Sequence, residues 1–240
     1  MYCVKLKRSL YGLKQSGRMW YNRLSEYLMQ KGYSNSDDCP CAFIKRSSSG
    51  FCIISVYVDD INIIGNSQNI VEARNHLKTE FEMKNLGKTK FCIGLQIEHL
   101  HPGILVHQSA YIPKILEKFN MDKSYPAKPP IVVRSIDPEK DVFGPRDKGE
   151  EIVGSEFPYL SLIRALMYLA NSTRPDIAFA VNLLARHSAA PTKRHWVGGK
   201  QILRYLNGTK DLDLFYKKNQ DPTLIGYTDA GYLSDPHNAR

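Results

Sequence analysis

The most informative stretch of this chain is "ISVYVDDINIIG", residues 54 to 65, where two acids interrupt an otherwise apolar run. Apolar residues lead up to the acids and resume directly after them. Two short apolar runs joined by a polar pair predict a β-hairpin with Asp59 and Asp60 at its tip. Adjacent carboxylates repel each other, and burying either charge without a partner is costly. The pair therefore calls for a functional explanation as well as a structural one.

The overall composition is that of an ordinary folded protein with a basic surface. The chain has 240 residues, of which 42% are hydrophobic and 24% charged. This composition allows one large domain or two small ones and excludes wholesale disorder. The net charge of +9 favours an anionic partner, of which nucleic acid is the commonest. A generally solvated basic surface would have the same composition, so charge alone leaves both explanations open.

The cysteines and the apolar content indicate an intracellular protein. The chain has five cysteines, an odd number that is typical of reduced thiols rather than of a disulfide framework. No apolar run approaches the roughly 20 residues that a bilayer requires, and the N-terminal residues lack the apolar core of a signal peptide. We therefore expect a protein of a cytoplasmic particle or of the nucleus, not secreted and with no membrane partner.

Hydrophobic periodicity divides the first half of the chain into helices and strands. Ser16 is a candidate cap for a basic helix that runs to about Lys31. "FCIISVYV", residues 51 to 58, is apolar nearly throughout, which predicts a strand covered on both faces. Further elements are expected in this order: a helix over 68 to 83 capped by Asn66 or Ser67, a strand "FCIGLQIE" over 91 to 98, its return strand after Pro102-Gly103, and a short helix over 111 to 120.

The second half begins with a proline-rich stretch and continues with helices. Periodicity is lost over 122 to 156, where five prolines fall among charges, so this segment is the predicted linker. Three helical patterns follow over 157 to 212, each opened by a proline suited to a first turn, and the third is amphipathic and basic. Residues 213 to 240 turn back to strand-like patterns.

An acid pair at a hairpin tip supports metal chemistry only in part. Magnesium in proteins takes one or two carboxylates together with water and substrate phosphates. Two-metal phosphoryl transfer needs carboxylates that converge from separate backbone segments, so Asp59 and Asp60 would be half of such a site. Acid pairs are also common in plain turns, and Asp37-Asp38 in a polar loop is interpreted as one. The apolar flanks on both sides distinguish Asp59-Asp60 from that pair.

Several motifs, in their order along the chain, resemble a known family. "SLYGLKQSGRMWY" (9 to 21), "YVDDINIIG" (57 to 65) and "FCIGLQIE" (91 to 98) are similar to the reverse transcriptase of copia-type LTR retrotransposons. Residues 165 to 212 resemble the segment that follows this polymerase in the Pol polyprotein. "LIGYTDAGYLSDP" (224 to 236) resembles the start of its RNase H domain, so the resemblance covers nearly the whole chain.

The resemblance implies an α+β fold with a definite order of parts. A partial polymerase palm, which is an antiparallel sheet with packed helices, and the start of the thumb would occupy residues 1 to 121. The proline-rich linker would follow over 122 to 156, and a helical thumb or connection over 157 to 212. Residues 213 to 240 would hold the first strands of a truncated RNase H-like domain.

The resemblance also implies roles for individual residues. Asp59 would be the principal ligand of a catalytic Mg²⁺ or Mn²⁺, with Asp60 beside it, and Gln15 would contact the incoming nucleotide. Gly94 and Leu95 would belong to the hairpin that holds the primer end. The implied partners are nucleic acid (an RNA template and a DNA primer), deoxynucleoside triphosphates and the remainder of the Pol polyprotein.

The basic helices and their aromatic residues have two interpretations. The first predicted helix and the basic third helix of the C-terminal part would track nucleic-acid phosphates without reading sequence. Trp20 or Tyr21 could stack on a base, although an aromatic residue at helical spacing belongs to a core at least as often. The segment that carries Trp20 departs mildly from the family, which usually has a proline where this chain has Gly17.

Neither implied catalytic site is complete within these residues. The family's polymerase uses another aspartate upstream of "SLYGLKQS", and "MYCVKLKR" (1 to 8) contains no acid. Asp229 would be the first RNase H carboxylate, and Asp235 is the only acid after it. We therefore expect no polymerase activity from this chain alone. Two alternatives stay open: a fragment of an enzyme polyprotein that is active only with its upstream part, and a relic that binds nucleic acid without catalysis.

Overall fold

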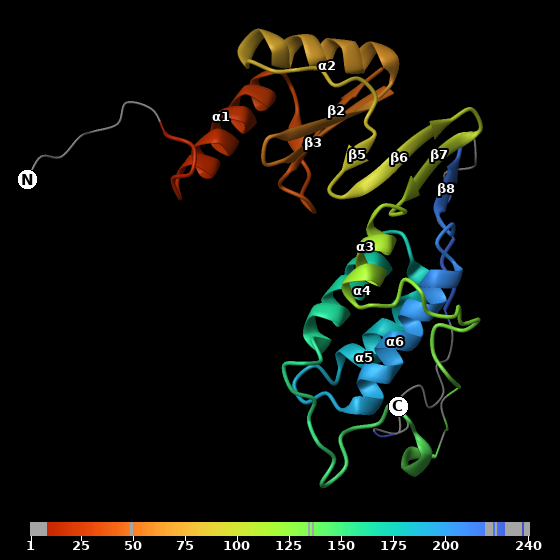
Figure 1. The fold of residues 1–240 in the computed structure, drawn as a ribbon. Helices are drawn as coiled ribbons and strands as arrows, with labels where there is room; N and C mark the ends of the chain where they lie inside the picture. The colour runs from red at the N-terminus through yellow and green to blue at the C-terminus, as the bar shows by residue number, and fades with distance from the viewer. Residues whose placement is uncertain are drawn as a thin grey trace, which may run out of the picture. The chain divides into compact units, whose positions relative to one another are not determined.

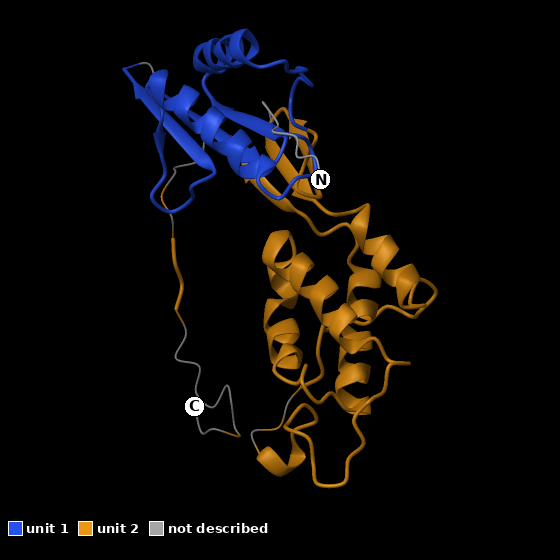
Figure 2. Ribbon diagram, turned by 90° about the vertical axis from the view of Figure 1, so that its left-hand side faces the viewer, with its two compact units in different colours: residues 1–89 blue, residues 90–240 orange. Residues whose placement is uncertain are grey.

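The computed structural model describes residues 9–48, 50–133, 135, 137–218, 223, 225–228 and 237. The chain forms two compact units, which divide between Thr89 and Lys90 (Figure 2). Each unit contains one four-stranded sheet, and the described residues form six α-helices. The fold is therefore mixed α and β with two antiparallel sheets, which is compatible with part of a polymerase domain.

The first unit, residues 1–89, is a sheet with two helices. Its elements are, in chain order, α1 (Ser16–Gln30), β1 (Ser34–Asn35), β2 (Ala42–Ser47), β3 (Gly50–Tyr57), β4 (Asp60–Gly65) and α2 (Ser67–Glu80) (Figure 1). The strands lie in the order β1-β2-β3-β4, and each neighbouring pair is antiparallel. The hairpin predicted from the acid pair is thus confirmed as β3 and β4.

The two helices of this unit begin differently from one another. The side chain of Asn66 accepts a hydrogen bond from the amide of Asn69 at 2.8 Å, so α2 has the predicted cap. The predicted cap of α1 is wrong, because Ser16 lies inside the helix and its hydroxyl donates to the carbonyl of Leu13. Gln15 is the N-cap residue instead, and its side chain makes no capping hydrogen bond.

Both helices bury the same face of the sheet. Leu24 and Leu28 of α1 share an apolar cluster with Leu77 of α2 and with Phe43 and Ile54 of the strands. Burial of this kind contributes roughly 1.5 to 3 kcal/mol for each large side chain removed from water. The cluster is the core of the first unit.

The prediction that β3 is covered on both faces is wrong. Side chains alternate along a strand, and Ile54 and Val56 point toward the helices and are buried. Phe51 and Tyr57 point to the other face and are 50% and 54% exposed. Antiparallel sheets commonly pack on one face only, and an apolar sequence does not show which of its residues reach the core.

The second unit, residues 90–240, combines a sheet with a helical bundle. Its strands and helices are β5 (Phe91–Cys92), β6 (Leu95–Leu100), β7 (Gly103–His107), α3 (Tyr111–Lys118), α4 (Tyr159–Ser172), α5 (Ala178–Ala185), α6 (Lys193–Gly208) and β8 (Leu214–Lys217). Short 3₁₀ turns occur at Pro138–Lys140 and Pro175–Ile177. The strand order is β5-β6-β7-β8, again antiparallel throughout.

A buried arginine, Arg174, connects two helices of the bundle. The guanidinium of Arg174 binds both carboxylate oxygens of Asp176, at 3.0 and 2.7 Å, and donates to the carbonyl of Thr209 at 2.9 Å. Its side chain is almost fully buried, so these contacts are needed to satisfy the charge. They join the start of α5 to the end of α6, around a core that α3, α4, α5 and α6 supply.

One strand prediction in this unit needs correction, and the predicted strand over 213 to 218 is confirmed as β8. "FCIGLQIE" is not one strand, because Ile93 and Gly94 form a tight turn between β5 and β6, with backbone φ angles of +50° and +79°. The first C-terminal strand, β8, pairs with β7, so it completes the sheet of this unit. The second predicted strand, over 224 to 232, lies largely outside the described residues, and Asp229 is among those not described.

The proline-rich segment is hydrogen-bonded to α6. Arg194 binds the carboxylate of Glu150 and donates to the carbonyls of Asp141, Val142 and Pro145. The hydrogen bonds from Arg194 lower the pKa of Glu150 to about 2. The part of the predicted linker that precedes α4 is therefore attached to the helical bundle.

Within the described part of the chain, no helix is long and apolar enough to cross a membrane.

Candidate functional site

The hairpin tip between β3 and β4 is a two-residue turn. Tyr57 and Asp60 face each other at the end of the ladder, which leaves Val58 and Asp59 as the central residues. Val58 has a φ of +53°, a conformation that is rare for a β-branched side chain. A positive φ at the first central position matches the twist of a hairpin, but glycine is the usual residue there. The backbone beside Asp59 is thus held in a strained conformation.

Trp20 of α1 holds this turn in place. Its indole N–H donates to the main-chain carbonyl of Val58 at 2.9 Å. The indole ring is fixed in turn by an edge-to-face contact with Phe81, with ring centroids 5.3 Å apart. The strained turn therefore has a partner on a packed helix, as expected where surrounding structure maintains an unfavourable backbone angle. Base stacking was one predicted role of Trp20, and its ring instead packs inside the unit.

Asp59 and Asp60 are both exposed at this tip. Carboxylates are the donors that Mg²⁺ and Mn²⁺ prefer, and exposure leaves them free to bind an ion together with water or phosphate oxygens. In the described ranges, no group of three or more histidine, cysteine, aspartate or glutamate side chains is placed to hold a metal. The donor type fits a divalent cation, and the pair supplies only part of a coordination shell.

Gln15 lies in the same unit, immediately before the first turn of α1. It is exposed, and α1 is the helix whose Trp20 contacts the hairpin tip. The sequence-predicted nucleotide contact and the acid pair are thus linked by one helix.

The predicted primer-binding residues form a second tight turn, in the second unit. Gly94 has a φ of +79°, and a Cβ atom there would meet the hydroxyl of Tyr168, a residue of α4. That hydroxyl donates to the carbonyl of Ile93 at 2.8 Å, and Leu95 begins the next strand. The turn is thus fixed against the helical bundle. Sequence reasoning missed both Tyr168 and the bond from Trp20, because main-chain acceptors leave no trace in the sequence.

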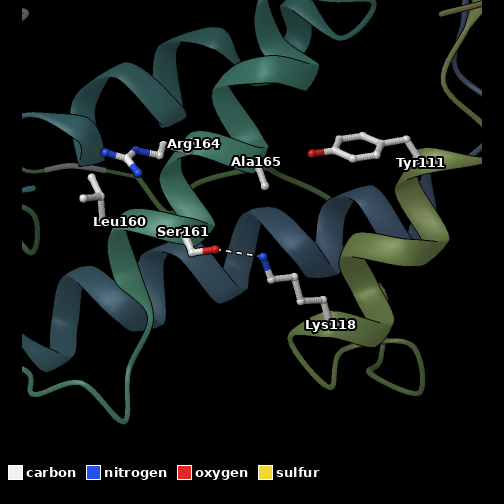
Figure 3. A pocket seen from close by; sticks show the side chains of 6 residues that line it. All are labelled: Tyr111, Lys118, Leu160, Ser161, Arg164 and Ala165. Atoms are coloured by element: carbon white, nitrogen blue, oxygen red, sulfur yellow. Dashed lines mark hydrogen bonds between the residues drawn. The ribbon is translucent and has the colours of Figure 1, made fainter. Parts of the chain in front are cut away.

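A depression between α3 and α4 has a volume of about 430 Å³. Figure 3 shows Lys118 and Ser161 facing each other across it, and the lysine Nζ donates to the serine Oγ at 2.9 Å. Arg164 points away from Lys118, toward Leu160 (Figure 3). The two cations do not converge, so the depression is not a built anion site.

Comparison with known proteins decides the family. Residues 1–133, more than half of the chain, match the sequence profile described as "Reverse transcriptase (RNA-dependent DNA polymerase)". The chain belongs to this reverse transcriptase family. The matched residues contain the hairpin tip, Trp20 and the turn at Gly94, so the family assignment rests on the segment that carries the candidate site.

Three relatives of this chain are named as Pol polyproteins of transposons. It is 36% identical over 244 aligned residues to the "Retrovirus-related Pol polyprotein from transposon TNT 1-94" of Nicotiana tabacum, an alignment that covers 100% of this chain and 18% of the relative. It is 32% and 31% identical to the corresponding proteins from transposons RE1 and RE2 of Arabidopsis thaliana, each over 98% of this chain and 15% and 16% of the relative. The chain spans less than a fifth of the length of these polyproteins. No solved structure matches it.

Proposed function

We propose that this chain supplies the metal-binding hairpin of an RNA-directed DNA polymerase, within a retrotransposon Pol polyprotein. The observation that carries the proposal is the acid pair at a strained two-residue turn that Trp20 holds by the carbonyl of Val58. A plain surface turn would have no need of a partner 38 residues away. Strained backbone conformations collect at functional sites, where the surrounding structure maintains them.

The residues of the chain would act by position and charge. Asp59 and Asp60 would hold Mg²⁺ or Mn²⁺, which when bound lowers the pKa of the primer hydroxyl and stabilises the leaving pyrophosphate. Trp20 would keep Asp59 at the tip while nucleic acid moves past it. Gln15 would contact the incoming deoxynucleoside triphosphate, and the turn at Gly94 and Leu95 would hold the primer end. Catalysis of phosphoryl transfer consists mainly of this kind of positioning and electrostatic stabilisation.

The 240 residues by themselves would not catalyse polymerisation. Two-metal phosphoryl transfer needs carboxylates from separate backbone segments, and the described part of the chain gathers no third acidic or histidine ligand at the tip. A polymerase would therefore form only with a carboxylate from another segment of a polyprotein. Asp229 would serve in the same way as one carboxylate of an RNase H site.

Primer extension on a primed RNA template tests the proposal in two arms. The first arm uses the chain alone, and the second a chimera in which the chain replaces the matching segment of the TNT 1-94 polyprotein. We expect extension by the chimera only, and Asp59→Asn should reduce its rate by several powers of ten, at least about 10³-fold. Asp38→Asn, the matched change in an exposed turn, should leave the rate unchanged.

Three results would count against the proposal. If the chain alone extends the primer and Asp59→Asn abolishes that extension, the chain's own residues complete the site. Extension by the chimera that survives Asp59→Asn would remove the hairpin from the chemistry. A chimera that folds but does not extend would show that this chain no longer supplies a working hairpin, and would favour the non-catalytic relic.

A further inference from the structure

A stretch of the proline-rich segment lies along α6. The side chain of Asn207 donates to the carbonyl of Ser124 at 2.7 Å, and the side chain of Gln201 donates to the carbonyl of Pro129 at 3.1 Å. Between them, the amide of Ala127 donates to the main-chain carbonyl of Arg204 at 3.2 Å. These three bonds fix residues 124–129 against the C-terminal half of the helix, so the segment and the helix present one continuous surface.

This surface carries positive charge without acidic residues. Neither residues 123 to 133 nor α6 contains an aspartate or a glutamate. Lys123, Lys128 and Arg204 are exposed, and Lys200 is half-buried beside the ring of Trp196. Across the ranges that the structure describes, no carboxylate forms a salt bridge with any of these cations. We call these four cations, together with Tyr125, the α6 surface.

Arg194, on the same helix, differs from the cations of the α6 surface because it binds other parts of the fold. Arg194, in the first turn of α6, is occupied by Glu150 and by three main-chain carbonyls of the proline-rich segment. Lys200 and Arg204 follow two and three turns later on the exposed side and have no such partners among the described residues. Hydrogen bonds within the fold thus account for Arg194. Lys200 packs over the ring of Trp196, and its charge, like that of Arg204, has no carboxylate or carbonyl partner among the described residues.

Tyr125 adds an aromatic platform to the positive charge. Its side chain is 91% exposed although it lies between Ser124 and Ala127, two residues that are bonded to α6. An exposed aromatic ring on a backbone that is fixed to a basic helix can stack on an unpaired base while cations of the segment and the helix contact phosphates. A base inside a duplex is stacked on its neighbours, so this arrangement suits a single strand.

We infer that the α6 surface binds single-stranded nucleic acid, through its four cations on the backbone and Tyr125 on a base. The inference deepens the proposed function and rests on it only for the class of partner. It places a nucleic-acid contact in the second unit that needs neither the hairpin acids nor a metal ion. Its failure and the failure of the polymerase proposal can therefore be observed separately.

Binding of a fluorescent oligothymidylate by the full chain, in EDTA, tests the inference by fluorescence anisotropy. The double variant Lys200→Gln and Arg204→Gln should weaken binding. The negative slope of log affinity against log salt should become shallower by about 0.7 for each phosphate that the variant no longer neutralises. Tyr125→Leu should weaken binding on the order of tenfold and leave the salt slope unchanged. Asp59→Asn should bind as the parent chain does, whatever it does to extension.

A charge-matched control distinguishes this surface from general basicity. Lys217→Gln combined with Lys218→Gln removes the same charge from exposed positions at the end of β8. An equal loss of affinity in this control, or unchanged binding in the Lys200 and Arg204 variant, would overturn the inference. Tighter binding of a duplex of equal length, insensitive to Tyr125→Leu, would overturn the single-strand assignment. Equal binding of polyglutamate would show a surface for acidic polymers rather than for nucleic acid.

Discussion

The indole N–H of Trp20 donates a hydrogen bond to the main-chain carbonyl of Val58 at 2.9 Å, across 38 residues of sequence. The bond joins the N-terminal part of α1 to the one residue at the hairpin tip with a positive φ. Because Val58 directly precedes Asp59, the helix and the strained turn together determine where the first carboxylate of the pair lies. The part of α1 that carries Trp20 and the "VDD" segment, residues 58 to 60, are thus held together in the first unit.

Trp20→Phe separates this hydrogen bond from ring packing. Phenylalanine keeps an aromatic contact with Phe81 and loses the N–H donor, so the free energy of unfolding of the first unit should fall by about 1 kcal/mol. Because the turn loses its hydrogen bond to α1, the rate of primer extension by the chimera should fall by about tenfold to a hundredfold. Urea unfolding and extension rates measure the two effects. Equal extension by the variant and the parent would show that Trp20 has a packing role only.

Val58→Asn tests the strain at the tip. Asparagine tolerates the left-handed region far better than valine, so the variant should raise the free energy of unfolding of the first unit by about 1 kcal/mol. Val71→Asn is the matched control, since Val71 is exposed on α2, where the two residues have similar helix propensity. Hydrogen exchange of the peptide spanning β3 and β4 reports the change. Destabilisation of the hairpin by Val58→Asn would contradict the presence of strain.

Gly94→Ala tests the second turn. The new methyl group would meet the Tyr168 hydroxyl, and alanine at a φ of +79° is strained in any case, so the second unit should lose about 2 kcal/mol or more of unfolding free energy. Adding Tyr168→Phe removes the hydroxyl and should restore part of that loss. The backbone strain would remain, so full restoration would show that the φ angle costs nothing. Urea denaturation of the four proteins of this cycle gives the coupling.

A stacked histidine pair makes the second unit sensitive to acid. The rings of His187 and His195 lie parallel, with centroids 4.1 Å apart. The amide of Thr192 donates to Nδ1 of His195, and Nε2 of the same ring lies 3.0 Å from the carbonyl of Gly144, so this ring is neutral with its proton on Nε2. Burial and then the neighbouring His195 lower the pKa of His187 to about 4, and burial lowers that of His195. Nearby charged groups are Asp141, Glu150, Arg186 and Arg194.

The sign of the pH effect follows from these directions. Because the folded pKa values lie below the ordinary 6.5, the unfolded chain binds more protons as the pH falls below 6.5. The stability that the neutral pair contributes is full above pH 6.5 and is lost as the pH falls toward about 4. His187→Gln should flatten the decline of unfolding free energy over this range, and His101→Gln, at an exposed turn, should not. Equal slopes in all three proteins would contradict the account.

The sequence predicts the local elements of this chain better than its long-range contacts. Asn66 is a recognisable cap, and the apolar runs around Asp59 predict the hairpin, because both signals depend on neighbouring residues. The turn at Gly94 lies within an apolar run that predicts a single strand, although the glycine itself is a signal for a turn. The bond from Trp20 to Val58 and the bond from Tyr168 to Ile93 end on main-chain carbonyls, which every residue carries. The resemblance supplied the roles of Asp59, Gln15 and Gly94, which local pattern alone does not assign.

The most direct test of the central claim is an NMR titration of the chain with Mn²⁺, in which a bound paramagnetic ion broadens nearby amide signals. If the hairpin tip holds the metal, broadening should begin at Val58, Asp59 and Asp60 and should disappear in Asp59→Asn. The equally exposed pair Asp37-Asp38 should stay sharp at the same Mn²⁺ concentration. Broadening of both acid pairs to the same extent, or broadening of the tip that survives Asp59→Asn, would contradict the assignment of this hairpin as the metal site.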